Sequence, residues 1–221
     1  KLCYEKLSWI YHYQSNYAIS LDYASKVLDL DPQSNSAIEV LLAASSTLLQ
    51  SHEITVERLL DTSFDSLDAF IFLSNPQFAE LEACIPPIRK LFEIPIKSLL
   101  HNRSMLLFSL TLGLYDFSKA SYKVALKNLQ RAIDFYNNIF HEPTQLINIY
   151  LRIGYCYLML KEKLKAIEVF NHSLNIINQS NENAINMIER NDIDFAALCQ
   201  KAGSLCYNHQ LLDLAVLYIH K

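Results

Sequence analysis

Two of the five cysteines are the first candidates for chemistry in this 221-residue sequence. Cys199 and Cys206 are seven residues apart, which places both thiols on one face of a helix. Two thiolates could bind a metal ion, but thiols packed between helices are the commoner case, and no CxxC pair supplies further ligands. The seven histidines are scattered, and none has the spacing of a motif such as HExxH. We therefore expect these side chains to be structural.

Two pairs of aspartates could supply carboxylate ligands to a metal ion. They are Asp29 with Asp31, and Asp192 with Asp194. The second pair lies where a helix is expected to begin, and acidic side chains stabilise a helix N-terminus. The sequence also lacks a glycine-rich phosphate-binding loop, because its three glycines lie in separate segments. These patterns predict no catalytic site, no metal and no cofactor, so we expect a protein that is not an enzyme.

The scarcity of glycine and proline indicates a helical protein. Sandwiches and barrels need a turn signal about every 8 to 12 residues. Three glycines and six prolines leave long stretches of this sequence without such a signal, although 51% of the residues are hydrophobic and can form a large core. The net charge of −4 is not that of a typical nucleic-acid-binding protein, which carries a basic surplus. We expect long helices with short connections and no nucleic-acid partner.

The distribution of apolar residues and cysteines predicts a cytoplasmic location, with a nuclear one as the alternative. No apolar run reaches the roughly 18 residues of a membrane span, and the sequence does not begin with a signal-peptide pattern. The odd number of cysteines favours reduced thiols. Because helical patterns run into both ends, we also expect the sequence to be a fragment of a longer protein.

The three glycines share a register that indicates an internal repeat. Gly113, Gly154 and Gly203 are each followed by an alanine twelve residues later and by a large apolar residue sixteen residues later. The alanines are Ala125, Ala166 and Ala215, and the large residues are Leu129, Phe170 and Ile219. Small residues on two helices joined by a short turn let the helices approach closely. We therefore expect helical hairpins in which Gly154 allows the next helix to come close through Ala166.

This pattern resembles the tetratricopeptide repeat (TPR), a helix–turn–helix of about 34 residues with the signature W-x2-L-G-x2-Y…A-x3-F…P. The clearest copy spans residues 147–180 and matches at Tyr150, Ile153, Gly154, Tyr157, Ala166, Phe170 and Ser173. Further copies begin at residue 1, at residue 106 and at about residue 196. In the first copy Ser8 replaces the glycine, and Tyr23 and Ala24 take the large and small sites in shifted order. Its Asp31-Pro32 matches the closing turn of the family, which gives Asp31 a structural role.

The resemblance implies an all-α fold, a right-handed superhelix (α-solenoid) of antiparallel helix hairpins. It divides the chain into TPR-like hairpins over 1–62, an atypical helical segment over 63–104, and a TPR-like array over 105–221. Three proline breakers cut the middle segment: Pro76, Pro86-Pro87 and Pro95. Degenerate hairpins are favoured there over an insert between two arrays, because apolar spacing persists throughout.

The hairpin expected over residues 35–62 is degenerate. Residues 34–50 predict its first helix, with Ser34 or Ser36 as the cap, and residues 52–60 predict a short second helix. Further on, Pro87 could begin a helix that runs to about residue 101.

Binding in such arrays occurs in the concave groove lined by the first helices. The family's groove positions fall here on Trp9, His12, Tyr13, Leu110, Leu114, Phe117, Leu151, Tyr155, Leu158 and Tyr207. These side chains are mostly apolar and aromatic, which suits a partner helix or peptide with hydrophobic anchors. The resemblance also implies no clamp for acidic chaperone tails, because Glu5 and Trp9 occupy clamp positions that need lysine and asparagine.

The function predicted from these features is that of a non-catalytic protein–protein interaction scaffold, a subunit or adaptor of a larger complex. The main alternative for the groove residues is packing within the protein itself. Two other functions remain open: a peptide-sensing TPR regulator, and the substrate-recruiting arm of an enzyme whose catalytic domain lies outside this sequence. An RNA-binding helical repeat is disfavoured by the mild acidity of the chain.

Overall fold

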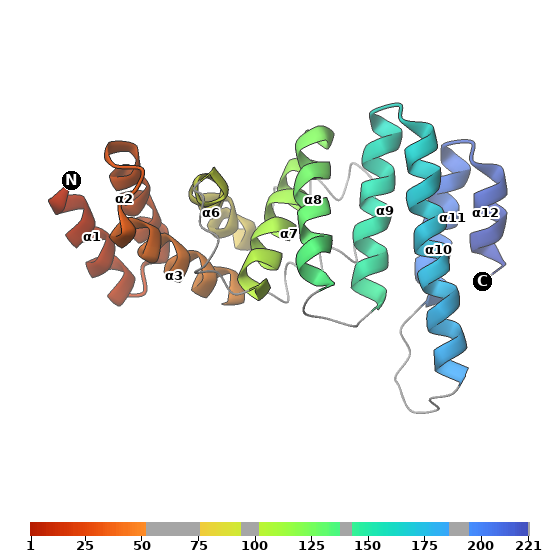
Figure 1. Ribbon diagram of the computed structural model, residues 1–221, viewed down its shortest axis with the longest axis horizontal. Helices are drawn as coiled ribbons and strands as arrows, with labels where there is room; N and C mark the ends of the chain where they lie inside the picture. The colour runs from red at the N-terminus through yellow and green to blue at the C-terminus, as the bar shows by residue number, and fades with distance from the viewer. Residues whose placement is uncertain (52–75, 94–101, 138–142, 186–194, 221) are drawn as a thin grey trace.

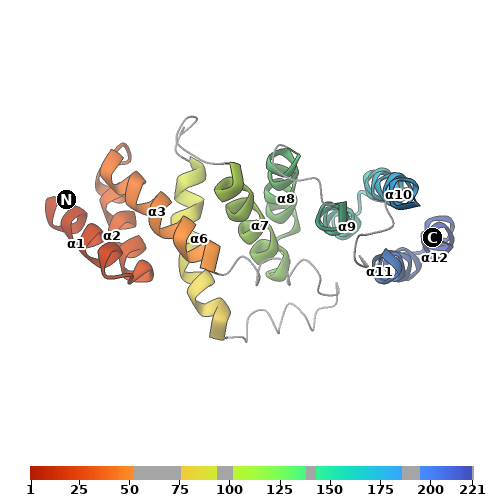
Figure 2. The same cartoon turned by 90° about the horizontal axis from the view of Figure 1, so that it is seen from below.

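The computed structural model describes residues 1–51, 76–93, 102–137, 143–185 and 195–220, and this part of the chain is all-helical. Its helices are α1 (Leu2–Tyr13), α2 (Tyr17–Leu30), α3 (Asn35–Ser51), α6 (Pro76–Glu93), α7 (Asn102–Ser118), α8 (Tyr122–Tyr136), α9 (Pro143–Met159), α10 (Lys163–Ile185), α11 (Phe195–Asn208) and α12 (Leu212–Ile219). Neighbouring helices pack in pairs, and the pairs follow one another along an elongated molecule with the termini at opposite ends (Figure 1). Seen from below, α9 to α12 are viewed nearly end-on, so their axes share one direction (Figure 2).

Four of the helix pairs in the described residues have the same hairpin geometry. They are α1/α2, α7/α8, α9/α10 and α11/α12. We count positions in each hairpin from a small residue of its first helix, which is Ser8, Gly113, Gly154 and Gly203 in turn. In each hairpin the first helix ends five residues after the small residue, and the second helix begins nine residues after it. The register expected from the three glycines is therefore present, and it extends to the first hairpin.

The same turn closes each of these hairpins. In the α9/α10 turn the N–H of Glu162 donates to the carbonyl of Tyr157 at 2.8 Å, and the N–H of Lys161 donates to the carbonyl of Leu158 at 2.9 Å. This pair of bonds is a Schellman motif, in which the residue after the helix adopts positive φ and is usually glycine. Here the positive-φ residues are Ser15, Ala120, Lys161 and Gln210, with φ of 58°, 56°, 64° and 59°. The glycines of this chain thus lie inside helices, and none is at these turns.

The Ala120→Gly variant is expected to raise the free energy of unfolding by roughly 0.5 to 1 kcal/mol, because glycine removes the Cβ strain of the left-handed conformation. Urea denaturation measures this gain. The matched control is Ser121→Gly, one residue later, where φ is −83° and glycine only adds entropy to the unfolded chain. A loss of stability at Ala120 equal to that at Ser121 would contradict the strain argument.

At Gly113 and Gly154 the nearest contact differs from the expected approach to alanine. A Cβ placed on Gly154 would lie 2.3 Å from Cε1 of Phe170, and one on Gly113 would lie 2.8 Å from Cδ2 of Leu129. The nearest neighbour is therefore the large residue sixteen positions later. At Gly203 the added Cβ would also lie 3.5 Å from the backbone oxygen of Ala215, the alanine twelve positions later. Glycine provides the space into which this large side chain packs.

The first hairpin keeps this register with smaller residues, so the shifted order assigned to Tyr23 and Ala24 is wrong. Ser20 stands twelve residues after Ser8, Ala24 stands sixteen after it, and all three are fully buried. The Ser20 hydroxyl donates to the Ser8 carbonyl at 2.8 Å, which satisfies a polar group at the close contact. Tyr23 instead stacks on Tyr11, with ring centroids 5.6 Å apart.

Helix α6 continues through Pro86 and Pro87, where the sequence predicts a break. Proline removes a backbone donor and clashes with the preceding turn, so such a helix needs support from tertiary packing. Ile85, Ile88 and Leu91 are buried in the core shared with α2, α3 and α7, and this burial offsets the helix-breaking tendency. The predicted helix over 52–60 and the segment around Pro95 lie outside the described residues.

Helix α9 contributes to both hydrophobic clusters of the core. Ile149, Ile153 and Cys156 belong to the cluster that contains α7 and α8, which precede α9. Ile147 and Leu151 belong to the cluster formed with α10, α11 and α12. One face of this first helix thus packs on the preceding hairpin, and another face packs on the second helix and the following hairpin.

Candidate functional site

Three of the predicted groove residues lie in the core. Leu110, Leu114 and Leu151 are 3%, 4% and 0% exposed, so they are not accessible to a partner in this structure. Leu151 packs in the cluster of α10, α11 and α12, which explains its burial. For these three positions the structure agrees with the alternative of internal packing, and their assignment to an open groove is wrong.

The other predicted residues reach the surface to different degrees. Tyr13 and Tyr207 are 78% and 66% exposed. Trp9, His12, Phe117, Tyr155 and Leu158 are half-buried. The accessible positions therefore concentrate at the last turn of each first helix, close to the hairpin turns.

Four rings form a continuous aromatic row across three hairpins. Tyr155 of α9 lies 5.4 Å from Phe117, 6.0 Å from Tyr122 and 5.7 Å from His209, measured between ring centroids. Phe117 also contacts Tyr122 edge-on at 5.9 Å. We call Phe117, Tyr122, Tyr155 and His209 the aromatic row. All four are half-buried, so each ring shows part of its surface while it packs against a neighbour.

A buried arginine supports the aromatic row. The guanidinium carbon of Arg152 lies 5.3 Å from the ring centroid of Phe117, within the range of a cation–π contact. Arg152 is only 3% exposed. Because it is engaged below the surface, Arg152 is not accessible to a partner in this structure.

Sequence reasoning missed two members of the aromatic row, Tyr122 and His209. The register supplies a signal for Tyr122. It stands nine residues after Gly113 and contacts Phe117, just as Tyr17 stands nine residues after Ser8 and contacts His12 edge-on at 5.6 Å. His209 lies in the turn after α11, and the register gives no comparable signal for it. Its contact with Tyr155 depends on how the two hairpins pack against each other.

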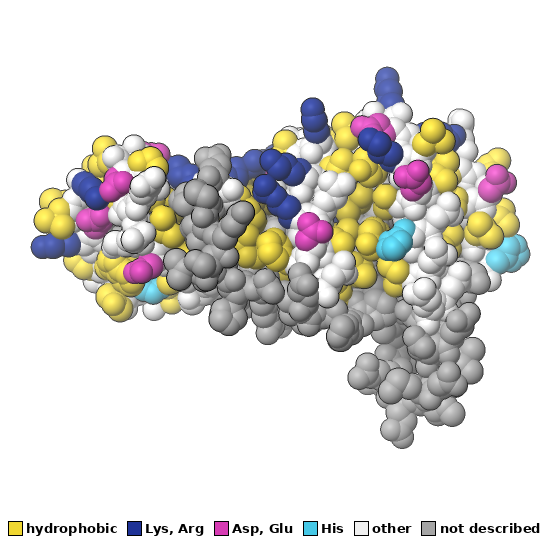
Figure 3. All heavy atoms as spheres, in the orientation of Figure 1, with side chains coloured by type: hydrophobic (Ala, Val, Ile, Leu, Met, Phe, Trp, Pro, Cys, Tyr) yellow, Lys and Arg dark blue, Asp and Glu magenta, His cyan; other side chains and the backbone are white. Residues whose placement is uncertain are grey.

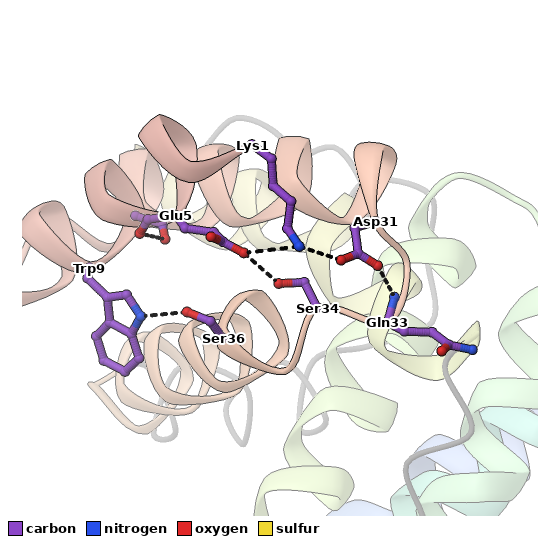
Figure 4. A network of polar contacts seen from close by, with 8 residues as sticks. Lys1, Glu5, Trp9, Asp31, Gln33, Ser34 and Ser36 are labelled. Atoms are coloured by element: carbon purple, nitrogen blue, oxygen red, sulfur yellow. Dashed lines mark hydrogen bonds and ion pairs between the residues drawn. The ribbon is translucent and has the colours of Figure 1, made fainter.

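In the first hairpin, Trp9 of α1 is hydrogen-bonded to α3, the helix that follows the hairpin. Its indole Nε1 donates to Oγ of Ser36 at 2.9 Å (Figure 4). Its ring also stacks on Tyr13, with ring centroids 5.7 Å apart. Ser34 likewise donates to Oε1 of Glu5 at 2.9 Å. Both serines considered as caps thus bond to α1 side chains, and they position α1 against α3.

The same polar network uses the Asp31 carboxylate. Lys1 Nζ lies 2.5 Å from Oδ2 of Asp31, and the backbone N–H of Gln33 donates to its Oδ1 at 3.2 Å (Figure 4). The Lys1 ammonium and the Gln33 N–H lower the pKa of Asp31 below its usual value. Asp29 is paired with Lys90 of α6 at 2.6 Å. Both carboxylates therefore serve to join helices, whereas Asp192 and Asp194 lie outside the described residues.

The two candidate thiols are packing residues. Cys199 and Cys206 are 4% and 0% exposed within the cluster of α9 to α12. Burial raises the pKa of Cys206 to about 12, so its free thiol stays protonated at neutral pH. Among the residues that the structure describes, no three histidine, cysteine or acidic side chains are grouped as metal ligands.

The described helices include none that combines the length and apolar character needed to cross a membrane. Comparison with models of protein families gave no match, and comparison with curated protein sequences gave no significant match either.

Proposed function

We propose that the chain is a non-catalytic protein–protein interaction scaffold, an α-solenoid of TPR-like hairpins that serves as a subunit or adaptor of a larger complex. The repeated register supports the solenoid, because hairpins with the same turn and the same close contact can stack with a constant relation to one another. A right-handed superhelix is the form that the TPR resemblance implies.

The observation that carries the binding function is the aromatic row. Tyr155 joins Phe117 and Tyr122 on one side to His209 on the other. Rigid rings that remain partly exposed offer contact area at a small entropy cost, and tyrosine is enriched at the centres of interfaces. We therefore propose that a helix or peptide with apolar anchors binds along this row and also contacts Tyr207, which is exposed on α11 two residues before His209.

Replacement of Tyr155 by leucine together with Tyr207→Ser is expected to abolish partner capture. Leucine keeps an apolar side chain against the α10–α12 cluster but removes the ring that contacts Phe117 and His209. We expect a stability loss of about 1 to 2 kcal/mol, which leaves the chain folded. The measurement is affinity capture from native extract with quantitative mass spectrometry, alongside urea denaturation.

The matched control is Leu164→Ser. Leu164 is 78% exposed on α10 and has no part in the aromatic row, so its removal changes the apolar surface elsewhere. Proteins captured by the wild type and by Leu164→Ser, but lost with the double variant, support the proposal. Equal capture by all three chains would overturn the proposed role of the row. The Tyr155→Ala plus Leu158→Ala variant is less suitable, because both side chains pack on the core and their truncation destabilises the hairpin.

A further inference from the structure

We propose that the outward face of α8 binds an acidic helix of a partner protein. The surface consists of Lys123, Lys127 and Arg131, which stand at every fourth position of α8, and we call these three residues the basic row. Lysine and arginine side chains gather around α8 in the space-filling view (Figure 3). None of the three residues belongs to the aromatic row, so binding here does not depend on the function proposed above.

The basic row lies on the side of α8 that its neighbours leave open. Helix α8 packs against α7 and α9, and the residues that it buries are Ala125, Asn128, Leu129, Ala132 and Tyr136. At 3.6 residues per turn, the basic row falls on the side of the helix away from most of these residues. Lys123 and Lys127 are exposed, and Arg131 is half-buried. The row is about 12 Å long, because each residue of a helix adds about 1.5 Å.

The same positions of the other second helices are not basic rows. The basic row occupies the positions ten, fourteen and eighteen residues after Gly113. In α2 these positions hold Ala18, Asp22 and Lys26, and in α10 they hold Leu164, Glu168 and His172; in α12 the first two hold Asp213 and Leu217. Asp22 and Lys26 neutralise each other in an ion pair of 2.6 Å. The unopposed positive charge is therefore particular to α8 and is not a property of the repeat.

Basic residues next to α8 already have acidic partners. Arg89 and Lys90 of α6 pair with Asp116 and Asp29, and Lys119 of the turn before α8 lies 3.6 Å from Glu82. By contrast, no carboxylate of the described residues forms an ion pair with Lys123, Lys127 or Arg131. The basic row thus presents positive charge that the described part of the chain does not neutralise.

The basic row is also fixed in place at one end. The guanidinium carbon of Arg131 lies 5.0 Å from the ring centroid of Phe92 on α6, a cation–π contact that holds the side chain and keeps its charge. Like charges four residues apart on a helix repel each other, and the only acidic residue of α8 is Asp134. Carboxylates supplied by a partner would remove this repulsion.

The spacing of the basic row favours a helix as the partner. Residues at every fourth position form one of the ridges by which helices pack, so a helix with glutamate at every fourth position matches the row. Val124 is 42% exposed and stands three residues before Lys127, which adds an apolar contact to the same surface. A long polyanion such as nucleic acid is disfavoured, because the chain as a whole carries a net charge of −4.

The test uses a labelled alanine-rich peptide of about 20 residues with glutamate at every fourth position, whose binding to the full chain is followed by fluorescence anisotropy. We expect binding that weakens as salt rises, because salt screens the exposed charges. Lys123→Glu together with Lys127→Glu is expected to lower the affinity at least about tenfold, because like charges then oppose the peptide.

The matched control is Lys6→Glu together with Lys163→Glu. These lysines are exposed on α1 and α10, and the double variant has the same net charge as the double variant of the basic row. We expect it to bind the peptide within about twofold of the wild type. Circular dichroism establishes that each variant is folded, and Lys123→Gln with Lys127→Gln replaces the charge reversal if that variant is not.

A second peptide of the same composition, with its glutamates scattered around the helix, tests the spacing. We expect it to bind more weakly than the first peptide. A wild type that binds neither peptide overturns the proposal, and so does equal loss of affinity in the two double variants. Equal binding of both peptides would overturn the match to a helix ridge. Tighter binding of single-stranded RNA or of anionic lipid vesicles than of the first peptide would overturn the acidic helix as the partner.

Discussion

Replacement of Gly154 by leucine is expected to lower the free energy of unfolding by about 3 to 5 kcal/mol, and replacement by alanine by about 1 to 3 kcal/mol. A Cβ at this position would lie 2.3 to 2.9 Å from three atoms of the Phe170 ring. Phe170 is fully buried, so its ring cannot move aside without disturbing the core. Helix propensity alone predicts the opposite sign, a gain of about 1 kcal/mol for Gly154→Ala.

The other two glycines supply the controls for this prediction. At Gly203 the nearest atom to an added Cβ is Cγ1 of Ile219 at 3.1 Å, and Ile219 is 68% exposed, so it can move. We therefore expect Gly203→Ala to be neutral or stabilising by up to about 1 kcal/mol. Gly113→Ala should fall between them, because Leu129 is buried but its nearest atom lies at 2.8 Å. Equal effects at all three positions, measured by urea denaturation, would contradict the packing argument.

The Asp116→Ala variant is expected to cost about 3 kcal/mol, because it breaks a contact that joins three helices. The Asp116 carboxylate is 3% exposed, pairs with the Arg89 guanidinium of α6, and accepts a hydrogen bond from Nδ2 of Asn128 of α8 at 3.0 Å. Without Asp116 the Asn128 amide, which is 5% exposed, loses this acceptor in the interior. Arg89 is 40% exposed and can turn to water, so its loss of a partner costs less.

A double-mutant cycle isolates the ion pair. We expect Arg89→Ala to cost about 1 to 2 kcal/mol, and the double variant to cost less than the sum by about 1 kcal/mol or more. Thermal and urea denaturation of the four chains measure these terms. Additivity within a few tenths of a kcal/mol would show that Asp116 acts through Asn128 alone. The matched control is Asp22→Ala with Lys26→Ala, an exposed pair on α2 for which we expect a coupling below about 0.5 kcal/mol.

The hairpins were accessible from the sequence because their determinants are local. A small residue in one helix and the residues twelve and sixteen positions later meet across a single short turn, so the pattern is visible as a fixed spacing. The positions of Gly113, Gly154 and Gly203 inside helices followed from this spacing. The predicted break at Pro86-Pro87 failed for the opposite reason, since α6 persists through burial against helices distant in the sequence.

The candidate site likewise combines features that local spacing predicts with features that depend on packing between hairpins. Tyr155 and Phe117 were identified from the register, but which of the ten positions are accessible depends on how successive hairpins pack. Leu151 and Tyr155 both lie on α9, yet Leu151 is fully buried while Tyr155 joins the aromatic row. The position of a residue in the repeat determines which way its side chain points from the helix. Whether that side chain is buried or exposed depends on how the neighbouring hairpin packs.

By itself, then, the sequence determined the helical hairpins, their register and the structural role of the glycines, because these depend on spacing within a few turns of helix. The tertiary structure decided which large side chain fills the space beside each glycine, that α6 tolerates two prolines, and that Tyr122 and His209 join Tyr155 in one row. The persistence of α6 through its prolines and the contact of His209 with Tyr155 depend on residues far apart in the chain, and no local pattern specifies them.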